Sequence, residues 1–235
     1  MKQKGIKLVA VIAMILLIFS VLITAFQVAV YGDSKYSFYR EEYEKYEVTE
    51  ALNMSLDQVM VVSNYMMRYL IGDEDELSIT TKVDGEVQDF FNEQDRFHME
   101  EVKDLFLGGL RLRNISLVIS IILLIGIIIV SRKESMLILP KAFLISFVIY
   151  MIFAGVIGRL FAMDFNKYFT IFHEIFFNND EWMFDYNTDY MIRMLPEGFF
   201  YDMLYRIIKV FAALLTAIGA VFTGLFVWRK HKDSL

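Results

Sequence analysis

Four long stretches without a charged side chain constrain this sequence more than any other feature. Residues 8–31, 114–131, 142–158 and 210–228 contain no Asp, Glu, Lys or Arg. Each stretch is close to the roughly 20 residues that an α-helix needs to cross a hydrocarbon core about 30 Å thick. Hydrophobic residues make up 57% of the chain, a larger share than soluble domains carry. We therefore predict an integral membrane protein, mainly α-helical, with four transmembrane helices.

The first apolar stretch follows three lysines, as the apolar core of a cleaved secretory signal follows its basic N-terminal region. Its apolar run is longer than the roughly 7–15 residues of a signal core, and no small-x-small cleavage pattern follows Gln27. We expect this segment to be retained as an N-terminal membrane anchor.

Basic residues predict the orientation, because cytoplasmic flanks of membrane helices are enriched in Lys and Arg. Three short flanks contain nine basic residues and only two acidic ones, Glu134 and Asp233. The basic residues are Lys2, Lys4, Lys7, Arg132, Lys133, Lys141, Arg229, Lys230 and Lys232. The remainder of the chain has 14 basic and 27 acidic residues, derived by subtracting the flanks from totals of 23 and 29. This asymmetry predicts both termini in the cytoplasm and two acidic segments outside.

The predicted organisation alternates between the two sides of the membrane. Its segments are a cytoplasmic N-terminus with the first transmembrane helix (1–31), an extracellular α+β cap (32–110), the second transmembrane helix (111–131), a cytoplasmic loop (132–141), the third transmembrane helix (142–163), an aromatic extracellular segment (164–206), the fourth transmembrane helix (207–228) and a cytoplasmic tail (229–235). The basic residues form short flanks and no continuous surface, so the sequence gives no support for nucleic-acid binding.

Local signals predict the elements of the cap. Ser55 and Gln58 have the spacing of a capping box, which predicts a helix over 56–71 that stops at Gly72. Residues 77–83 alternate as a strand does, and Asp84-Gly85 is typical of a tight hairpin, so 86–91 should return antiparallel. A second helix is predicted over 92–107, ending at Gly108-Gly109, with its apolar side toward the membrane helices.

Two of the chain's three histidines fall in the predicted extracellular segments. His98 lies on the apolar side of the helix over 92–107. His173 lies in a run where Phe165, Phe169, Phe172 and Phe176 recur at helical spacing, so it should stand on an interfacial helix beside aromatic rings. Histidine can exchange a proton near neutral pH, and two at one site could act as base and acid. Buried histidines also serve simply as hydrogen-bonding groups, and interfacial rings are common in membrane proteins.

Other chemistries have little support in the sequence. There is no cysteine, which excludes a thiol nucleophile and a disulfide. His173-Glu174 begins like a zinc protease motif, but Phe177 occupies the position of the second histidine ligand. We expect no metal and no cofactor. Arg159 lies at the outer end of the third predicted span, where a charged side chain is energetically costly. It either binds a ligand or extends its guanidinium to the interface.

Several segments resemble the lipoprotein intramolecular transacylases of Gram-positive bacteria. These are residues 98–103 (HMEEVK), 172–177 (FHEIFF), 194–197 (MLPE) and 199–202 (FFYD), together with Trp182 and Asp189. The resemblance covers nearly the whole chain and includes four spans, an outer cap and two histidines in the same relative places. The family commonly has aspartate where this chain has Glu101.

The resemblance implies an acyl transfer within one substrate molecule. The acyl chain at the sn-2 position of the S-diacylglyceryl group moves to the α-amino group of the lipoprotein's N-terminal cysteine, which gives a lyso-form lipoprotein. No external acyl donor, nucleotide or metal takes part. Direct attack closes an eight-membered ring, so holding the two ends together is where a rigid aromatic cavity should contribute.

The predicted catalytic residues are His98 and His173, with His98 assigned as the base and His173 as the group that stabilises the oxyanion or protonates the glyceryl oxygen. The predicted substrate-binding residues are Glu101, Arg159, Phe169, Phe172, Phe176, Trp182 and Tyr190. Expected partners are diacylglyceryl lipoproteins and membrane lipid, with no obligate protein partner. Three alternatives remain: a non-enzymatic membrane interaction protein, an intermolecular lipoprotein N-acyltransferase that takes its acyl group from phospholipid, and a metal-dependent membrane hydrolase.

Overall fold

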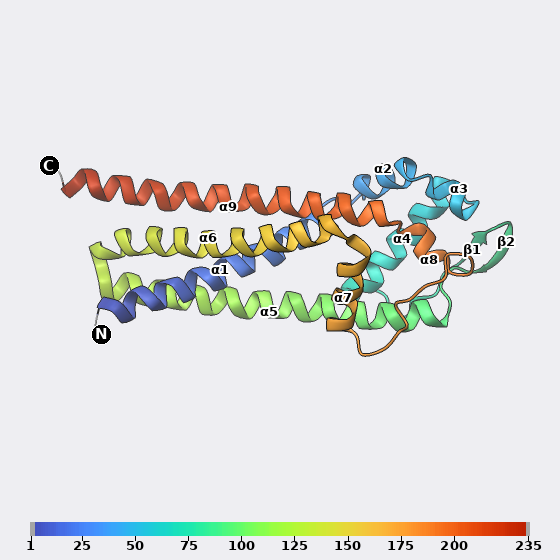
Figure 1. The fold of residues 1–235 in the computed structure, drawn as a ribbon, viewed down its shortest axis with the longest axis horizontal. Helices are drawn as coiled ribbons and strands as arrows, with labels where there is room; N and C mark the ends of the chain where they lie inside the picture. Colours follow the sequence, from blue (N-terminus) through green and yellow to red (C-terminus); the bar gives the residue numbers. More distant parts are fainter. Residues whose placement is uncertain (1–2, 234–235) are drawn as a thin grey trace. The chain divides into compact units, whose positions relative to one another are not determined.

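The computed structural model describes residues 3–233, drawn as a ribbon in Figure 1. These residues form two compact units. The membrane-helix unit contains residues up to 26, 110–168 and the chain from 208 onward. The second unit, which we call the cap unit, contains 27–109 and 169–207. Lys2 of the N-terminal basic flank and residues 234–235 of the predicted tail lie outside the described residues.

The membrane-helix unit consists of long, apolar helices. They are α1 (Gln3–Tyr31), α5 (Glu93–Ser131), α6 (Ser135–Met163) and α9 (Glu197–Asp233). The last turn of α1 and the beginnings of α5 and α9 belong to the cap unit. By length and composition, three helical segments of the described chain can cross a membrane: Gln3–Tyr31, Glu93–Met163 and Glu197–Lys232. The middle segment is 71 residues long and contains both α5 and α6.

The chain reverses between α5 and α6. A 3-10 turn, η1 (Arg132–Glu134), joins them, and Arg132 there has a positive φ of 46°. After the turn α6 runs back in the opposite direction (Figure 1). A loop was expected over 132–141, but the structure is helical again from Ser135, because residues 136–139 are apolar and include good helix formers. Pro140 lies inside the helix.

The predicted helix over 92–107 does not end at Gly108-Gly109, so that prediction was wrong. Helix α5 continues through both glycines. Glycine costs only about 1 kcal/mol in a helix interior, and helix continues on both sides of the pair. Residues 93–113 carry nine charged side chains, whereas 114–131 carry none, so the membrane-compatible part of α5 begins after Arg113.

Hydroxyl groups link α1 to its neighbours in the membrane-helix unit. Ser120 donates a hydrogen bond to the Ala13 carbonyl at 2.8 Å, and Tyr150 donates to the Ile15 carbonyl at 3.1 Å. Ala10 and Ala13 are fully buried, which lets neighbouring side chains approach the α1 backbone. Small residues and interhelical hydrogen bonds are the usual means of helix association in a membrane, because lipid tails remove the hydrophobic driving force.

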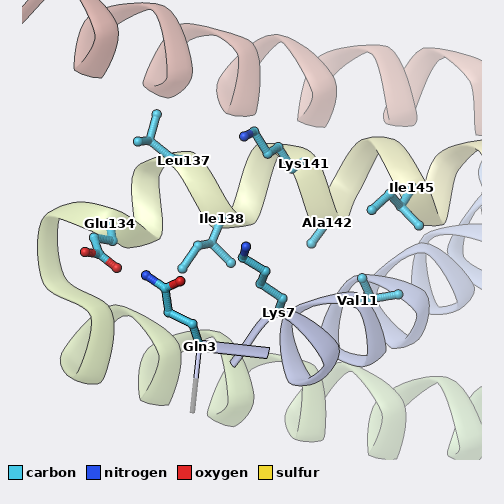
Figure 2. Close-up of a pocket in the computed structure, with 9 residues that line it drawn as sticks. All are labelled: Gln3, Lys7, Val11, Glu134, Leu137, Ile138, Lys141, Ala142 and Ile145. Atoms are coloured by element: carbon cyan, nitrogen blue, oxygen red, sulfur yellow. The ribbon is translucent and has the colours of Figure 1, made fainter. Parts of the chain in front are cut away.

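A groove of about 370 Å³ lies between α1 and α6 (Figure 2). Its lining residues are Gln3, Lys7, Val11, Glu134, Leu137, Ile138, Lys141, Ala142 and Ile145. The beginning of α1 therefore lies beside η1. The groove has an aliphatic wall and two lysines, Lys7 and Lys141. Such lysines suit the boundary between hydrocarbon and head groups, because their stems can lie along apolar surface while the amine reaches water.

The cap unit is built from shorter elements. They are α2 (Ser37–Lys45), α3 (Val48–Leu52), α4 (Leu56–Ile71), β1 (Thr80–Val83), β2 (Glu86–Asp89) and α8 (Tyr190–Met194), with the beginnings of α5 and α9 and most of α7 (Phe165–Phe176). The two strands pair antiparallel with Val83 opposite Glu86. Both Asp84 and Gly85 have positive φ, as a two-residue hairpin turn requires. The predicted hairpin is confirmed, with shorter strands.

Local capping fixes α4 as the sequence predicted. The Ser55 hydroxyl accepts from the Gln58 backbone N–H, and the Gln58 side chain accepts from the Ser55 backbone N–H. Gly72 ends the helix with a φ of 87°. The core of the unit is aromatic and aliphatic: Tyr43 is fully buried, its hydroxyl lies 2.6 Å from that of Ser63, and Phe199 from α9 stacks on its ring.

Candidate functional site

Two histidines from different parts of the sequence meet in the cap unit. His98 lies in the second turn of α5, and His173 lies near the end of α7. Their ring centroids are 5.9 Å apart with an interplanar angle of 33°. Both side chains are buried, with 6% and 7% of their surface exposed. A single reacting group between the rings could touch both, since proton transfer needs heavy atoms about 2.6–3.2 Å apart.

Aromatic rings surround the histidine pair. Phe177 contacts both imidazoles, with centroid distances of 4.9 Å to His98 and 5.5 Å to His173. The other rings in contact with one histidine or the other are Phe169 at 4.1 Å, Phe172 at 5.4 Å, Trp182 at 4.8 Å and Phe184 at 5.5 Å. We call these five rings and the two imidazoles the aromatic cluster. Such a surrounding is apolar and shields the imidazoles from water.

Four hydrogen bonds attach the loop between α7 and α8 to α5 and to Asn92 just before it, and so position the cluster. The Asn92 amide donates to Asp189 Oδ1 at 2.8 Å. The Gln94 amide donates to the carbonyls of residues 181 and 183 at 3.0 and 3.1 Å. The Asn179 amide donates to Glu101 Oε1 at 2.9 Å. These contacts lie before and after His98 along α5, so the loop presents Trp182 and Phe184 to the histidines.

The two imidazoles differ in their hydrogen bonds. His173 Nδ1 lies 2.8 Å from the Phe169 carbonyl oxygen. A carbonyl only accepts, so Nδ1 carries the proton, and Nε2 of the neutral ring keeps its lone pair. His98 Nδ1 is buried and has no hydrogen-bond partner among the residues that the structure describes.

Burial favours the neutral form of both histidines. Desolvation and the neighbouring His173 lower the pKa of His98 to about 4. Desolvation also lowers the pKa of His173, and the hydrogen bond to the Phe169 carbonyl acts in the opposite direction. Both rings are therefore uncharged near neutral pH, as a base and a hydrogen-bond donor for acyl transfer need to be.

Glu101 lies one turn after His98 on α5. Asn179 holds its Oε1, while Oε2 is buried without a partner among residues 3–233. A buried acceptor without a donor is costly, so this oxygen is free to accept from a donor brought to it. Within the same residues, no three His, Cys, Asp or Glu side chains are grouped to hold a metal ion.

The structure brings some of the predicted binding residues to the histidines and not others. Phe169, Phe172 and Trp182 contact His173 directly. Phe176 contacts Phe172, at 4.8 Å, and is about half exposed. The Tyr190 ring instead lies 5.7 Å from that of Phe90, and its hydroxyl accepts from the Gln88 side-chain amide at 2.7 Å. Arg159 belongs to α6 in the membrane-helix unit and is exposed. Its role in binding stays a prediction.

Three residues of the site were not predicted from the sequence. Phe177 follows His173 by four residues, so helical spacing alone could have suggested it. Phe184 and Asn179 come from the loop after α7, whose path has no sequence signal.

The fold and the site define a membrane-integral protein with a buried, aromatic-lined histidine pair. A family model described as lipoprotein intramolecular transacylase Lit matches residues 11–200. The chain therefore belongs to the lipoprotein intramolecular transacylase family, a class of acyltransferases that modify lipoproteins.

Comparison with solved structures agrees on the fold. The membrane-integral lipoprotein intramolecular transacylase Lit of Bacillus cereus has a TM-score of 0.75 at 21% identity, and the match covers 99% of both chains. A structure of the same Bacillus cereus protein with one histidine substituted by arginine has a TM-score of 0.73 at 22% identity and covers 99% of this chain and 94% of that one. No curated protein sequence matched significantly.

Proposed function

We propose that this enzyme transfers an acyl chain from the sn-2 position of S-diacylglyceryl to the α-amino group of the same N-terminal cysteine. The product is an N-acyl, S-monoacylglyceryl lipoprotein, and diacylglyceryl lipoproteins are the substrates. The observation that carries the proposal is the pair of buried imidazoles 5.9 Å apart inside the aromatic cluster of a family member.

Four membrane spans and an extracellular active site are part of the proposal. The chain reversal at η1 supports counting α5 and α6 as two spans, because each has an uncharged stretch of membrane length. The basic flanks at the start of α1, at η1 and at the end of α9 support a cytoplasmic position for both termini. The cap unit then lies outside, where lipid-modified lipoproteins are displayed.

In the proposed reaction the amine nitrogen attacks the ester carbonyl within one bound substrate molecule. A new N–C bond forms, and the C–O bond to the glyceryl oxygen breaks. One proton leaves the attacking nitrogen and finally reaches the glyceryl oxygen, so no other reactant is needed. The free α-amino group has a pKa of about 7.7–8.0, and transfer into a water-poor site favours its neutral, nucleophilic form.

The hydrogen bonds favour His173 as the base, in place of the assignment made from sequence. The Phe169 carbonyl holds the proton on Nδ1, so Nε2 is the atom able to take the amine proton and return it to the glyceryl oxygen. His98, with a pKa of about 4, is the weaker base. As a neutral ring it can donate from Nε2 to the oxyanion of the tetrahedral intermediate, and such a donor stabilises the transition state.

The aromatic cluster supports the entropic part of catalysis. An eight-membered ring closes slowly in solution because many torsions must be fixed at once. Rigid rings around the acyl chains restrict the substrate to conformers in which nitrogen and carbonyl are close, and well-oriented intramolecular reactions gain many orders of magnitude in rate.

Glu101 should orient the attacking amine, because its unpartnered Oε2 accepts an N–H. We expect Glu101→Gln to raise KM for a diacylglyceryl lipopeptide about 10-fold and to change kcat less, since one charge-assisted hydrogen bond contributes about 1.5–3 kcal/mol. Steady-state kinetics of the purified enzyme measure both constants. Glu100→Gln, on the neighbouring face of α5, is the matched control. An unchanged KM for Glu101→Gln would remove this residue from substrate binding.

The reaction itself is tested in a bacterium that makes only diacylglyceryl lipoproteins. The chain is expressed there, and the N-terminal lipopeptide of one lipoprotein is sequenced by tandem mass spectrometry. The expected lipopeptide has the mass of the substrate, with one acyl group moved from glycerol to nitrogen. A gain of one acyl group would indicate an intermolecular acyltransferase, loss of one would indicate a hydrolase, and an unchanged lipopeptide would contradict the proposal.

A further inference from the structure

The groove between α1 and α6 is lined by the last charged residue before each of two uncharged stretches. Lys7 directly precedes the stretch 8–31 on α1, and Lys141 directly precedes the stretch 142–158 on α6. These stretches are the parts of the two helices that hydrocarbon can surround. The two lysines therefore lie at the level where hydrocarbon gives way to phospholipid head groups.

Apolar side chains continue the groove from the lysines into the uncharged stretches. On α1, Val11 follows Lys7 by four residues and lines the same groove. On α6, Ile145 follows Lys141 by four residues and does the same. Residues four apart share one face of a helix, so each lysine has an aliphatic side chain one turn deeper. At that depth the Ser146 hydroxyl donates to the Val11 carbonyl at 3.3 Å, which joins the two helices.

The ammonium groups in the groove are not neutralised by the protein. Among residues 3–233, neither Lys7 nor Lys141 forms an ion pair or a side-chain hydrogen bond. Glu134 also lines the groove and forms no ion pair with either of them. Figure 2 shows the Lys7 side chain extending from α1 toward α6. Two positive charges and one negative charge thus give the groove a net charge of +1.

We infer that this groove binds one anionic phospholipid, with the lipid phosphate between the ammonium groups of Lys7 and Lys141 and an acyl chain along the apolar wall. Basic pockets between transmembrane helices are sites at which anionic head groups bind. A lipid with one net negative charge balances the net charge of the groove, whereas a zwitterionic lipid does not. Gln3 and Glu134 are polar lining residues that can hydrogen-bond uncharged hydroxyl groups, so a phosphatidylglycerol head group fits best.

A lipid in this position would hold α1 to α6 at the end where the Ser146 hydrogen bond does not reach. Because a ligand that binds only the folded protein stabilises it by mass action, the lipid should raise the thermal stability of the enzyme. The inference does not depend on the proposed acyl transfer, and its test needs no lipoprotein.

Native mass spectrometry of the detergent-purified full chain, titrated with phosphatidylglycerol or phosphatidylcholine, measures the binding. We expect the first phosphatidylglycerol to bind wild type about tenfold more tightly than phosphatidylcholine does. The double variant Lys7→Gln/Lys141→Gln should bind phosphatidylglycerol about tenfold more weakly than wild type, because it lacks both phosphate partners. Phosphatidylglycerol should also raise the midpoint of thermal unfolding of wild type and leave that of the double variant unchanged.

Lys4→Gln/Lys133→Gln is the matched control, because it removes the same charge from α1 and η1 at exposed positions outside the groove lining. It should bind phosphatidylglycerol as wild type does. Lys7→Arg/Lys141→Arg should stay within about threefold of wild type, since guanidinium groups also bind phosphate, and this variant keeps the test valid if the glutamine pair fails to fold.

Three results would overturn the inference. Equal weakening by the two glutamine pairs would indicate attraction to the basic flanks in general, with no site in the groove. Phosphatidylcholine that binds as tightly as phosphatidylglycerol would indicate that the groove does not select charge. A wild-type dimer that Lys7→Gln/Lys141→Gln abolishes would assign the groove to a second copy of the chain. Failure of the proposed function would appear separately, as enzyme that forms no N-acyl product.

Discussion

Replacing His173 by asparagine should abolish nearly all N-acylation, with kcat about 10²–10⁴-fold lower than in wild type. The asparagine amide can replace Nδ1 as the donor to the Phe169 carbonyl, so the local structure is kept. What it cannot supply is a basic nitrogen in the position of Nε2. Conversion of a synthetic diacylglyceryl lipopeptide by detergent-purified enzyme, followed by mass spectrometry, measures the loss.

The control for this variant is His231→Ala, in the last turn of α9, which should retain wild-type activity. Thermal unfolding of both proteins checks that the cap unit is intact. If His173→Asn kept more than about a tenth of wild-type kcat while folded, His173 could not be the base, since general bases contribute at least about 10².

His98 should show a different pattern, because its proposed role is donation and not proton removal. We expect His98→Ala to lose about 10²–10³ in kcat, the usual effect of removing an oxyanion donor. His98→Gln should recover much of this loss and stay within about 10-fold of wild type, because its amide can donate from near the position of Nε2. The same lipopeptide assay compares the two variants.

His173→Gln provides the matched comparison, since glutamine supplies a donor but no base. It should be as inactive as His173→Asn, whereas His98→Gln is not. The opposite pattern, with glutamine tolerated at 173 and not at 98, would restore the division of labour inferred from the sequence.

Elements with local signals could be predicted from the sequence. The capping box at Ser55 and Gln58 determines where α4 begins, and Asp84-Gly85 determines the hairpin turn, because each depends on residues that are neighbours in the chain. The helix of His173 was also predicted, and α7 spans Phe165–Phe176 as its phenylalanine spacing indicated. The end of α5 was not predicted correctly, because the helix continues through the glycines at 108 and 109.

The site was only partly predictable, because several of its contacts join residues that are far apart in the chain. The sequence selected both histidines, and their surroundings at Phe169, Phe172 and Trp182, from spacing and family resemblance. It could not place Asn179 on Glu101 or Phe184 on His98, because these contacts join residues about 80 positions apart through an irregular loop.

The order of the chain around η1 has a consequence for biosynthesis. The ribosome completes His98 before it begins the reversal formed by α5 and α6, and His173 emerges only after that reversal. A nascent chain arrested between the two therefore has half of the imidazole pair and no aromatic cluster. A complete imidazole pair can therefore form only after α5, α6 and α7 have all been synthesised.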